Sequence, residues 1–110
     1  MKATRPIRLQ LSRRSGFNLK SASRKANDLP VVKVDRSTRW GNPFSAHTKD
    51  VRFRCDDVDQ AVEYYRRFVI AMRMDLRPLR GKNLACWCKL PKRGEPDVCH
   101  AAELLELANR

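Results

Sequence analysis

Three short stretches of the chain carry the pattern of β-strands. Apolar and polar side chains alternate over Ile7–Leu11, as in a strand with one covered face. Leu29–Val34 is rich in β-branched residues, and Leu84–Trp87 is an apolar run bounded by Gly81 and Pro91. We therefore predict three strands, with Leu84–Trp87 at the centre of the sheet.

The second half of the chain has the period of helices. Apolar residues recur every three or four positions between about Val58 and Met74, after Asp57, which can cap a helix with Gln60 at its third position. Asp97 is a candidate N-cap for a second, final helix. The predicted apolar faces are Ala61, Val62, Tyr65, Phe68, Val69 and Met72 in the long helix, and Val98, Ala101, Ala102, Leu104, Leu105 and Ala108 in the final one.

The remaining segments lack a clear period. Residues 1–6 form a loose start, and Ser21–Asn27 is polar and basic, so we expect residues 1–6 and 18–28 to be flexible loops. The order of elements is strand, strand, long helix, strand, helix. For a chain of 110 residues this predicts one compact, basic α/β domain over residues 1–110, with helices packed on a small single-layer sheet.

The chain has no apolar segment that resembles a signal peptide or is long enough to span a membrane. We therefore expect a cytoplasmic protein with no membrane partner. In a reducing compartment, its four cysteines are better explained as metal ligands or reactive thiols than as disulfides.

Charge is distributed unevenly along the chain. The net charge is +12, of which residues 1–54 carry +11 and residues 55–110 carry +1. A basic half joined to a nearly neutral half is typical of a protein that binds nucleic acid or another polyanion. A solvated surface or a disordered basic arm would give the same imbalance.

Two basic stretches contain candidate phosphate contacts. The turn Ser12–Gly16 holds adjacent arginines, which can fork onto phosphate oxygens, although a solvated turn has the same composition. In the second stretch, Asp35–Phe44, Trp40 could stack on a base beside Arg36 and Arg39; alternatively, Trp40 and Phe44 pin the intervening turn to the core. The candidate nucleic-acid or phosphate contacts are Arg13, Arg14, Arg36, Arg39, Trp40 and Asn42.

The window Asn83–His100 contains three of the four cysteines and one of the two histidines. Two residues apart on a strand, Cys86 and Cys88 face the same side, and the loop of ten residues after them can return Cys99 and His100 to that side. Three thiolates and an imidazole match a zinc site in ligand type. The candidate metal ligands are thus Cys86, Cys88, Cys99 and His100, although their spacing is not that of a standard zinc knuckle.

Two other interpretations of this window stay open. With Asp97 as N-cap, Cys99 would occupy the second helical position, where backbone N–H groups stabilise a thiolate. Cys99 and His100 would then be a catalytic pair, or the polar floor of a pocket for a phosphate or nucleotide. Alternatively, the cysteines are only small core residues, which explains Cys86 or Cys88 better than the adjacent Cys99 and His100.

Four blocks of the sequence together resemble a known family. Arg8–Phe17, Arg39–Phe44, Leu79–Cys88 and Cys99–Leu105 are similar, in this order, to the blocks of a small bacterial and phage family catalogued as domain of unknown function 4326. The resemblance implies a compact α/β domain in which the Arg-Trp-Gly-Asn-Pro-Phe and Cys-Trp-Cys…Cys-His blocks converge on one site. It implies no activity.

The sequence leads to one main hypothesis and two alternatives. We expect a small phage- or bacteria-type protein that binds nucleic acid or a nucleotide through its basic N-terminal half and a Cys/His pocket. The first alternative is a thiol- or metal-dependent enzyme that acts on a nucleotide or a modified base. The second is a zinc-stabilised module that binds a protein partner.

Overall fold

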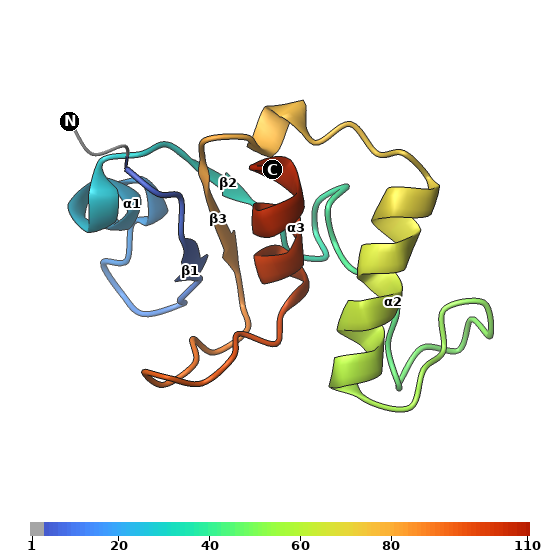
Figure 1. The fold of residues 1–110 in the computed structure, drawn as a ribbon. Coiled ribbons are helices and arrows are strands. Elements are labelled where there is room, and N and C mark those ends of the chain that lie inside the picture. The colour runs from blue at the N-terminus through green and yellow to red at the C-terminus, as the bar shows by residue number, and fades with distance from the viewer. Residues whose placement is uncertain (1–3) are drawn as a thin grey trace.

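The computed structural model describes residues 4–110, and in this range strands alternate with helices along the chain (Figure 1). The strands are β1 (Arg8–Gln10), β2 (Val31–Lys33) and β3 (Asn83–Cys86). The helices are α1 (Leu19–Asn27), α2 (Val58–Ala71) and α3 (His100–Ala108), and η1 (Arg77–Leu79) is a short 3₁₀ turn. The predicted α/β class is confirmed.

The three strands form one parallel sheet in the order β1-β3-β2. In its register Ala85 lies opposite Leu9 of β1, and Leu84 lies opposite Val32 of β2. All four residues of β3 are buried, as expected for a central parallel strand that is covered on both faces. The apolar run at Leu84–Trp87 thus identified the central strand, although the strand ends at Cys86.

Helices cover both sides of the sheet. Figure 1 shows α1 on one side, α3 on the other, and α2 outside α3. Helix α3 packs on β3 and β1, and α2 packs on α3, where Arg66 bridges to Glu103 and Glu106 at 2.6 and 3.0 Å. The largest fully buried apolar side chains of this core are Tyr65, Leu79, Leu84, Leu104 and Val34.

The prediction of a loop over residues 18–28 is wrong, because α1 occupies most of this segment. The side chain of Asn18 caps the helix by accepting a hydrogen bond from the Ser21 N–H at 3.0 Å. Its inward face is partly polar: the Ser23 hydroxyl is buried, donates to the Leu29 carbonyl and accepts from Asn83. The inward residues Leu19, Ala22, Ser23 and Asn27 recur at helical spacing, but only two of the four are apolar, so the apolar pattern was too short to be recognised as a helix.

Other boundaries differ by a few residues. The helix predicted to reach Met74 ends at Ala71, and Arg73 adopts a left-handed φ of 50°. The expected flexible segment 1–6 lies partly outside the described residues.

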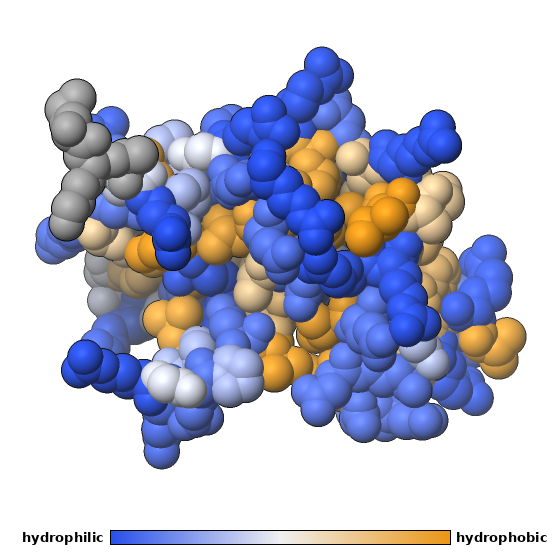
Figure 2. Space-filling view, viewed as in Figure 1, coloured by the Kyte–Doolittle hydropathy of each residue, from blue (hydrophilic) through white to orange (hydrophobic). Residues whose placement is uncertain are grey.

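Among residues 4–110, no helix is both long and apolar enough to cross a bilayer. Hydrophilic side chains cover most of the face in Figure 2, with apolar ones in separate patches.

Candidate functional site: a cysteine cluster beside a two-part pocket

The carboxyl ends of the parallel strands meet the start of α3 at one edge of the sheet. Strand β3 ends at Cys86, and β2 is followed by the buried residues Val34 and Asp35. Cys99 is the N-cap of α3. This edge is where open α/β sheets usually bind ligands, because the chain leaves the sheet there and loops line a crevice.

Three cysteine sulfurs converge at this edge. The Sγ atoms of Cys86, Cys88 and Cys99 all lie within 4.8 Å of one another, and Cys86 and Cys99 are 3.0 Å apart. Cys86 and Cys99 are buried, whereas Cys88 is exposed. All three are free thiols. The cluster can hold a metal ion, as the sequence predicted for these three residues. Cys55 is buried and lies outside the cluster, as predicted.

A buried arginine closes the loop that carries the cluster. The guanidinium of Arg8 donates to both carboxylate oxygens of Asp97 at 2.7 Å, and to the carbonyls of Cys88 and Lys89 at 2.6 and 3.0 Å. One nitrogen also lies 3.7 Å from the Cys86 sulfur. Arg8 therefore ties β1 to both ends of the loop, and it places a positive charge beside the thiols.

Asp97 is thus not the N-cap of the final helix, contrary to the prediction. Both oxygens of its carboxylate accept hydrogen bonds from Arg8. Val98, the next residue, is exposed and precedes the helix. Cys99 occupies the N-cap position in place of the predicted second helical position. Cys99 therefore lies at the start of the final helix, as predicted, but the helix begins at His100, later than predicted.

Hydrogen bonding gives the three thiols different pKa values. Cys86 and Cys99 hydrogen-bond to the Cys88 sulfur, which lowers the pKa of the Cys88 thiol far below its usual value. The bond to Cys88 raises the pKa of Cys86, and the bonds to Cys86 and then to Cys88 raise the pKa of Cys99. Cys88, the most exposed of the three, is therefore the thiol whose deprotonation this environment favours, and Arg8 lies nearby.

His100 stands beside the cluster with a fixed tautomer. Its Nε2 lies 2.6 Å from the Val34 carbonyl, which can only accept a hydrogen bond, so Nε2 carries the proton. Burial lowers the pKa of His100, and the neutral ring leaves Nδ1 unprotonated, 3.9 Å from the Cys99 sulfur. Metal-bound histidines are commonly oriented in this way by a backbone carbonyl. The group of mutually close ligand atoms does not include His100.

A pocket of two parts adjoins the cluster. The larger part, which we call the chamber, has a volume of about 710 Å³. It is lined by the three clustered cysteines, His100 and Trp87, and by the carboxylate residues Asp35, Asp56 and Asp57. Its apolar lining, the larger share, includes Phe44, Val58, Ala61, Val62 and Val98.

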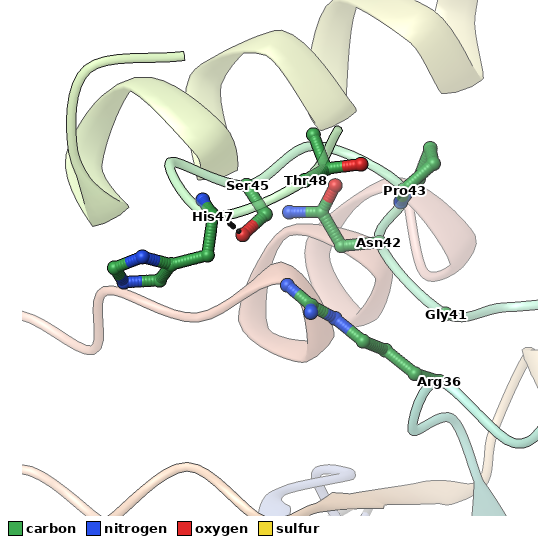
Figure 3. A pocket seen from close by; sticks show the side chains of 7 residues that line it. All are labelled: Arg36, Gly41, Asn42, Pro43, Ser45, His47 and Thr48. Carbon is green, nitrogen blue, oxygen red and sulfur yellow. Dashed lines mark hydrogen bonds between the residues drawn. The ribbon is translucent and has the colours of Figure 1, made fainter. Parts of the chain in front are cut away.

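The smaller part, which we call the annex, has a volume of about 440 Å³ and is shown in Figure 3. It is lined by Arg36, Ser45, His47 and Thr48 with the turn Gly41–Pro43, and the Arg36 side chain extends across it below Asn42 (Figure 3). Arg36, Asn42, Ser45 and His47 line both parts, so chamber and annex adjoin.

The turn that forms the annex is fixed by close backbone packing. A Cβ added at Gly41 would lie 2.5 Å from the Arg36 Cα and 2.9 Å from the Asp35 carbonyl oxygen, so only glycine fits. Asn42 is buried and holds the turn, because its amide donates to the Ala61 carbonyl and accepts from the Phe44 N–H. Its polar atoms are engaged within the protein, so its main role is structural, although it lines the pocket.

The prediction that Trp40 stacks on a base is contradicted by its burial. Trp40 is 5 % exposed, belongs to the core, and its carbonyl accepts a hydrogen bond from the Tyr65 hydroxyl at 2.6 Å. Arg39 covers the Trp40 ring at 4.3 Å and does not line the pocket. The alternative given for this aromatic pair, that it pins the turn to the core, describes the structure.

The structure therefore brings together some predicted site residues and separates others. Cys86, Cys88, Cys99 and His100 meet Arg36 at one pocket. Arg13 and Arg14 are exposed and outside its lining; Arg13 stacks on Trp87 at 4.4 Å, and Trp87 is itself part of the chamber.

Sequence reasoning missed Arg8, Asp35 and Trp87. Arg8 falls on a polar position of the alternating strand, which predicts a solvent-facing side chain. Neither its own neighbours nor those of Asp35 indicate partners that lie 89 and 52 residues away. An arginine between apolar residues of a strand was the one local signal available for Arg8.

Comparisons with known proteins agree with the resemblance noted in the sequence. The family model described as "Domain of unknown function (DUF4326)" matches residues 17–110, so the chain belongs to this family. Neither the curated proteins nor the solved structures include a match to the chain. The family carries no assigned function, so function has to be inferred from the site.

Proposed function

We propose that this protein binds a nucleotide, either free or as part of a nucleic acid, in the chamber and annex. The observation that carries the proposal is the position of Arg36, which stands where an apolar chamber joins a polar annex. A nucleotide also has an apolar and a polar part. Its flat heterocycle would be buried among the apolar groups of the chamber, and its phosphate would be bound by the arginine.

Dimensions and charge support this assignment. Ligand pockets usually measure roughly 300 to 1,000 Å³, and a chamber of about 710 Å³ lies in that range. In the annex, His47 and the hydroxyls of Ser45 and Thr48 add polar groups around Arg36. The net charge of +12 favours a polyanionic ligand and predicts that affinity for nucleic acid falls as salt rises.

The test compares two arginines that differ in position but not in charge. Calorimetry with nucleoside monophosphates, and filter binding with short single-stranded DNA and RNA, would be run on the native protein, Arg36→Ala and Arg39→Ala. We expect Arg36→Ala to weaken binding about tenfold or more, since it removes a charge-assisted hydrogen bond. Arg39→Ala should bind like the native protein, because Arg39 covers Trp40 outside the pocket.

Three results would contradict the proposal. The first is no binding of any nucleotide or oligonucleotide at low salt. The second is oligonucleotide binding that does not depend on salt. The third is equal loss in both arginine variants, which would place binding on the general basic surface and not in the pocket.

The cluster of Cys86, Cys88 and Cys99 supports a second proposal, that the protein holds a zinc ion. Thiolates favour Zn²⁺ among the common divalent ions, and the three sulfurs lie close enough together to bind one ion. A Zn²⁺ ion with three thiolates carries a net charge of −1, which the adjacent Arg8 offsets. His100 Nδ1, oriented by the Val34 carbonyl, is the candidate fourth ligand.

If water or a ligand takes that fourth position instead, the site has the composition of a catalytic zinc centre. This favours the alternative of a metal-dependent enzyme acting on the bound nucleotide, because the chamber lining includes all three cysteines. A bound zinc ion would polarise a ligand oxygen or lower the pKa of a bound water.

Metal analysis and turnover assays separate these alternatives. One equivalent of zinc together with nucleotide hydrolysis that is lost in His100→Ala or Cys88→Ser, with the fold retained, supports an enzyme. Zinc without nucleotide binding leaves a zinc-stabilised interaction module. Protein purified without metal, and unable to take up Zn²⁺ on titration, would contradict the zinc proposal.

A further inference from the structure

We propose that Trp87 is the surface on which the base of the bound nucleotide stacks. This rests on the proposed function and specifies it: recognition would need an aromatic heterocycle and not only a phosphate. The inference is carried by four features of Trp87, namely its exposure, its place in the chamber, the hydrogen bond that fixes its ring, and the arginine on that ring.

Of the two tryptophans, only Trp87 can present its ring to a ligand. It is 40 % exposed, compared with 5 % for Trp40. Trp87 lies between Cys86 and Cys88, just past the end of β3, and it contributes to the chamber. Exposing a large aromatic ring to water is unfavourable, and such a ring in a ligand-sized pocket often marks a site that a ligand covers.

A hydrogen bond holds the ring in place before any ligand arrives. The indole N–H of Trp87 donates to Asp35 Oδ2 at 2.8 Å, and Asp35 is buried. The other carboxylate oxygen of Asp35 accepts from the hydroxyl and the N–H of Ser37 at 2.5 and 3.2 Å. A ring that is already oriented loses little conformational entropy when a base stacks on it, which favours affinity.

Arg13 covers one face of the Trp87 ring. Its guanidinium carbon lies 4.4 Å from the ring centre, and Arg13 is not among the residues that line the chamber. The proposal places the base on the opposite face, so that the ring is backed by a cation, an arrangement that strengthens binding to single-stranded nucleic acid and nucleotides. Arg36, at the junction of chamber and annex, is placed for the phosphate of the same ligand.

The test uses tryptophan fluorescence and calorimetry together. The Trp40→Phe variant leaves Trp87 as the sole tryptophan, whose emission can be excited selectively over that of the two tyrosines. It would be titrated with AMP, GMP, CMP and UMP, and with ribose 5-phosphate. We expect the nucleotides to quench Trp87, whereas ribose 5-phosphate binds weakly without quenching, because only a base can stack. Calorimetry on the native protein supplies affinities that do not depend on the fluorophore.

Substitutions at Trp87 give the second readout. Trp87→Leu should weaken nucleotide binding about five- to a hundredfold, the loss expected for one base–aromatic stack, and leave ribose 5-phosphate unchanged. Trp87→Phe keeps a stacking ring and should retain most of the affinity, so an effect of misfolding in the leucine variant would be recognised. Circular dichroism of both variants checks the fold.

The outcomes separate this inference from the proposal it rests on. Nucleotide binding that is equally tight in Trp87→Leu, with no quenching of Trp87, would overturn the stacking role and leave the pocket assignment intact. Equal weakening for nucleotides and ribose 5-phosphate in Trp87→Leu would also overturn it. Absence of nucleotide binding in the native protein would overturn both.

Discussion

Arg8 and Asp97 lie 89 residues apart in the sequence and form a two-bonded ion pair beside the cysteine cluster, with both N–O distances 2.7 Å. The Arg8 side chain is 3 % exposed and that of Asp97 is 24 % exposed. The same guanidinium binds the carbonyls of Cys88 and Lys89, so a single side chain from β1 holds both ends of the loop between β3 and α3. The cysteine cluster therefore depends on a residue that is not a cysteine.

Replacing Arg8 should destabilise the protein strongly. Arg8→Ala leaves Asp97 and two carbonyls without their donor, and removing one member of a buried ion pair costs about 3 kcal/mol or more. Urea denaturation measures this as a loss in the free energy of unfolding. The matched control is Arg67→Ala on α2, whose exposed pair with Glu63 should contribute less than about 1 kcal/mol. Equal effects of the two substitutions would show that Arg8 does not organise the loop.

Metal binding should require the clustered cysteines and not the remaining one. We expect about one equivalent of zinc in the native protein and in Cys55→Ala, because Cys55 lies outside the cluster, and a large loss of zinc in Cys99→Ser. Since a metal that binds only the folded state stabilises it, a chelator should lower the melting temperature of the native protein and of Cys55→Ala, but not that of Cys99→Ser. Elemental analysis and thermal unfolding measure both effects. A chelator that leaves the native melting temperature unchanged would contradict a zinc-stabilised fold.

The annex should be sensitive to a single methyl group. Gly41→Ala places a Cβ 2.5 Å from the Arg36 Cα and 2.9 Å from the Asp35 carbonyl oxygen, and since both of these are backbone atoms, one segment has to move. We expect a cost of about 1–3 kcal/mol, as for overpacked sites, together with weaker nucleotide binding because Arg36 shifts. Gly94→Ala is the comparison: its added Cβ meets no atom within 4 Å, and only its φ of 86° opposes the change. Unaltered nucleotide affinity in Gly41→Ala would show that the position of Arg36 is not set by this contact.

Local sequence patterns predicted those parts of the molecule that apolar burial determines. The run at Leu84–Trp87 and the stripe on α2 identify the central strand and the long helix, because each buries a periodic apolar face. The cysteines converge because one ends a strand, the second lies two residues beyond it, and the third precedes a helix that packs on that strand. This arrangement is visible in the sequence once the three elements are assigned.

Polar contacts between distant segments account for what could not be predicted. Helix α1 is anchored by Ser23 and Asn27 to Asn83, and the loop before α3 is anchored by Arg8. Trp40 and Trp87 both stand beside chain-reversing segments, and their neighbours along the sequence do not tell them apart. Only packing decides that Trp40 enters the core while Trp87 stays in the pocket, so the sequence did not show which tryptophan is accessible to a ligand.

Asp35 should make stability depend on pH in the acid range. Burial alone raises the pKa of Asp35, but the hydrogen bonds from Ser37 and Trp87 outweigh it, and the net pKa is lowered. A carboxylate whose folded pKa is below its unfolded value of about 3.9 contributes stability that is fully present at higher pH. That contribution is lost as the pH falls through the folded pKa, because a protonated Asp35 no longer accepts the charge-assisted hydrogen bonds that stabilise its carboxylate.

Urea denaturation of the native protein and Asp35→Asn between pH 3 and 7 measures this contribution. The native protein should be the more stable of the two at pH 6–7, and the difference should shrink below about pH 4. Asp59→Asn, an exposed carboxylate on α2, controls for the general change in charge. Because Trp87 is bound to Asp35, its emission in Trp40→Phe should change over the same acid range. A stability difference that stays constant from pH 7 to pH 3 would mean that the Asp35 charge does not hold the Trp87 ring.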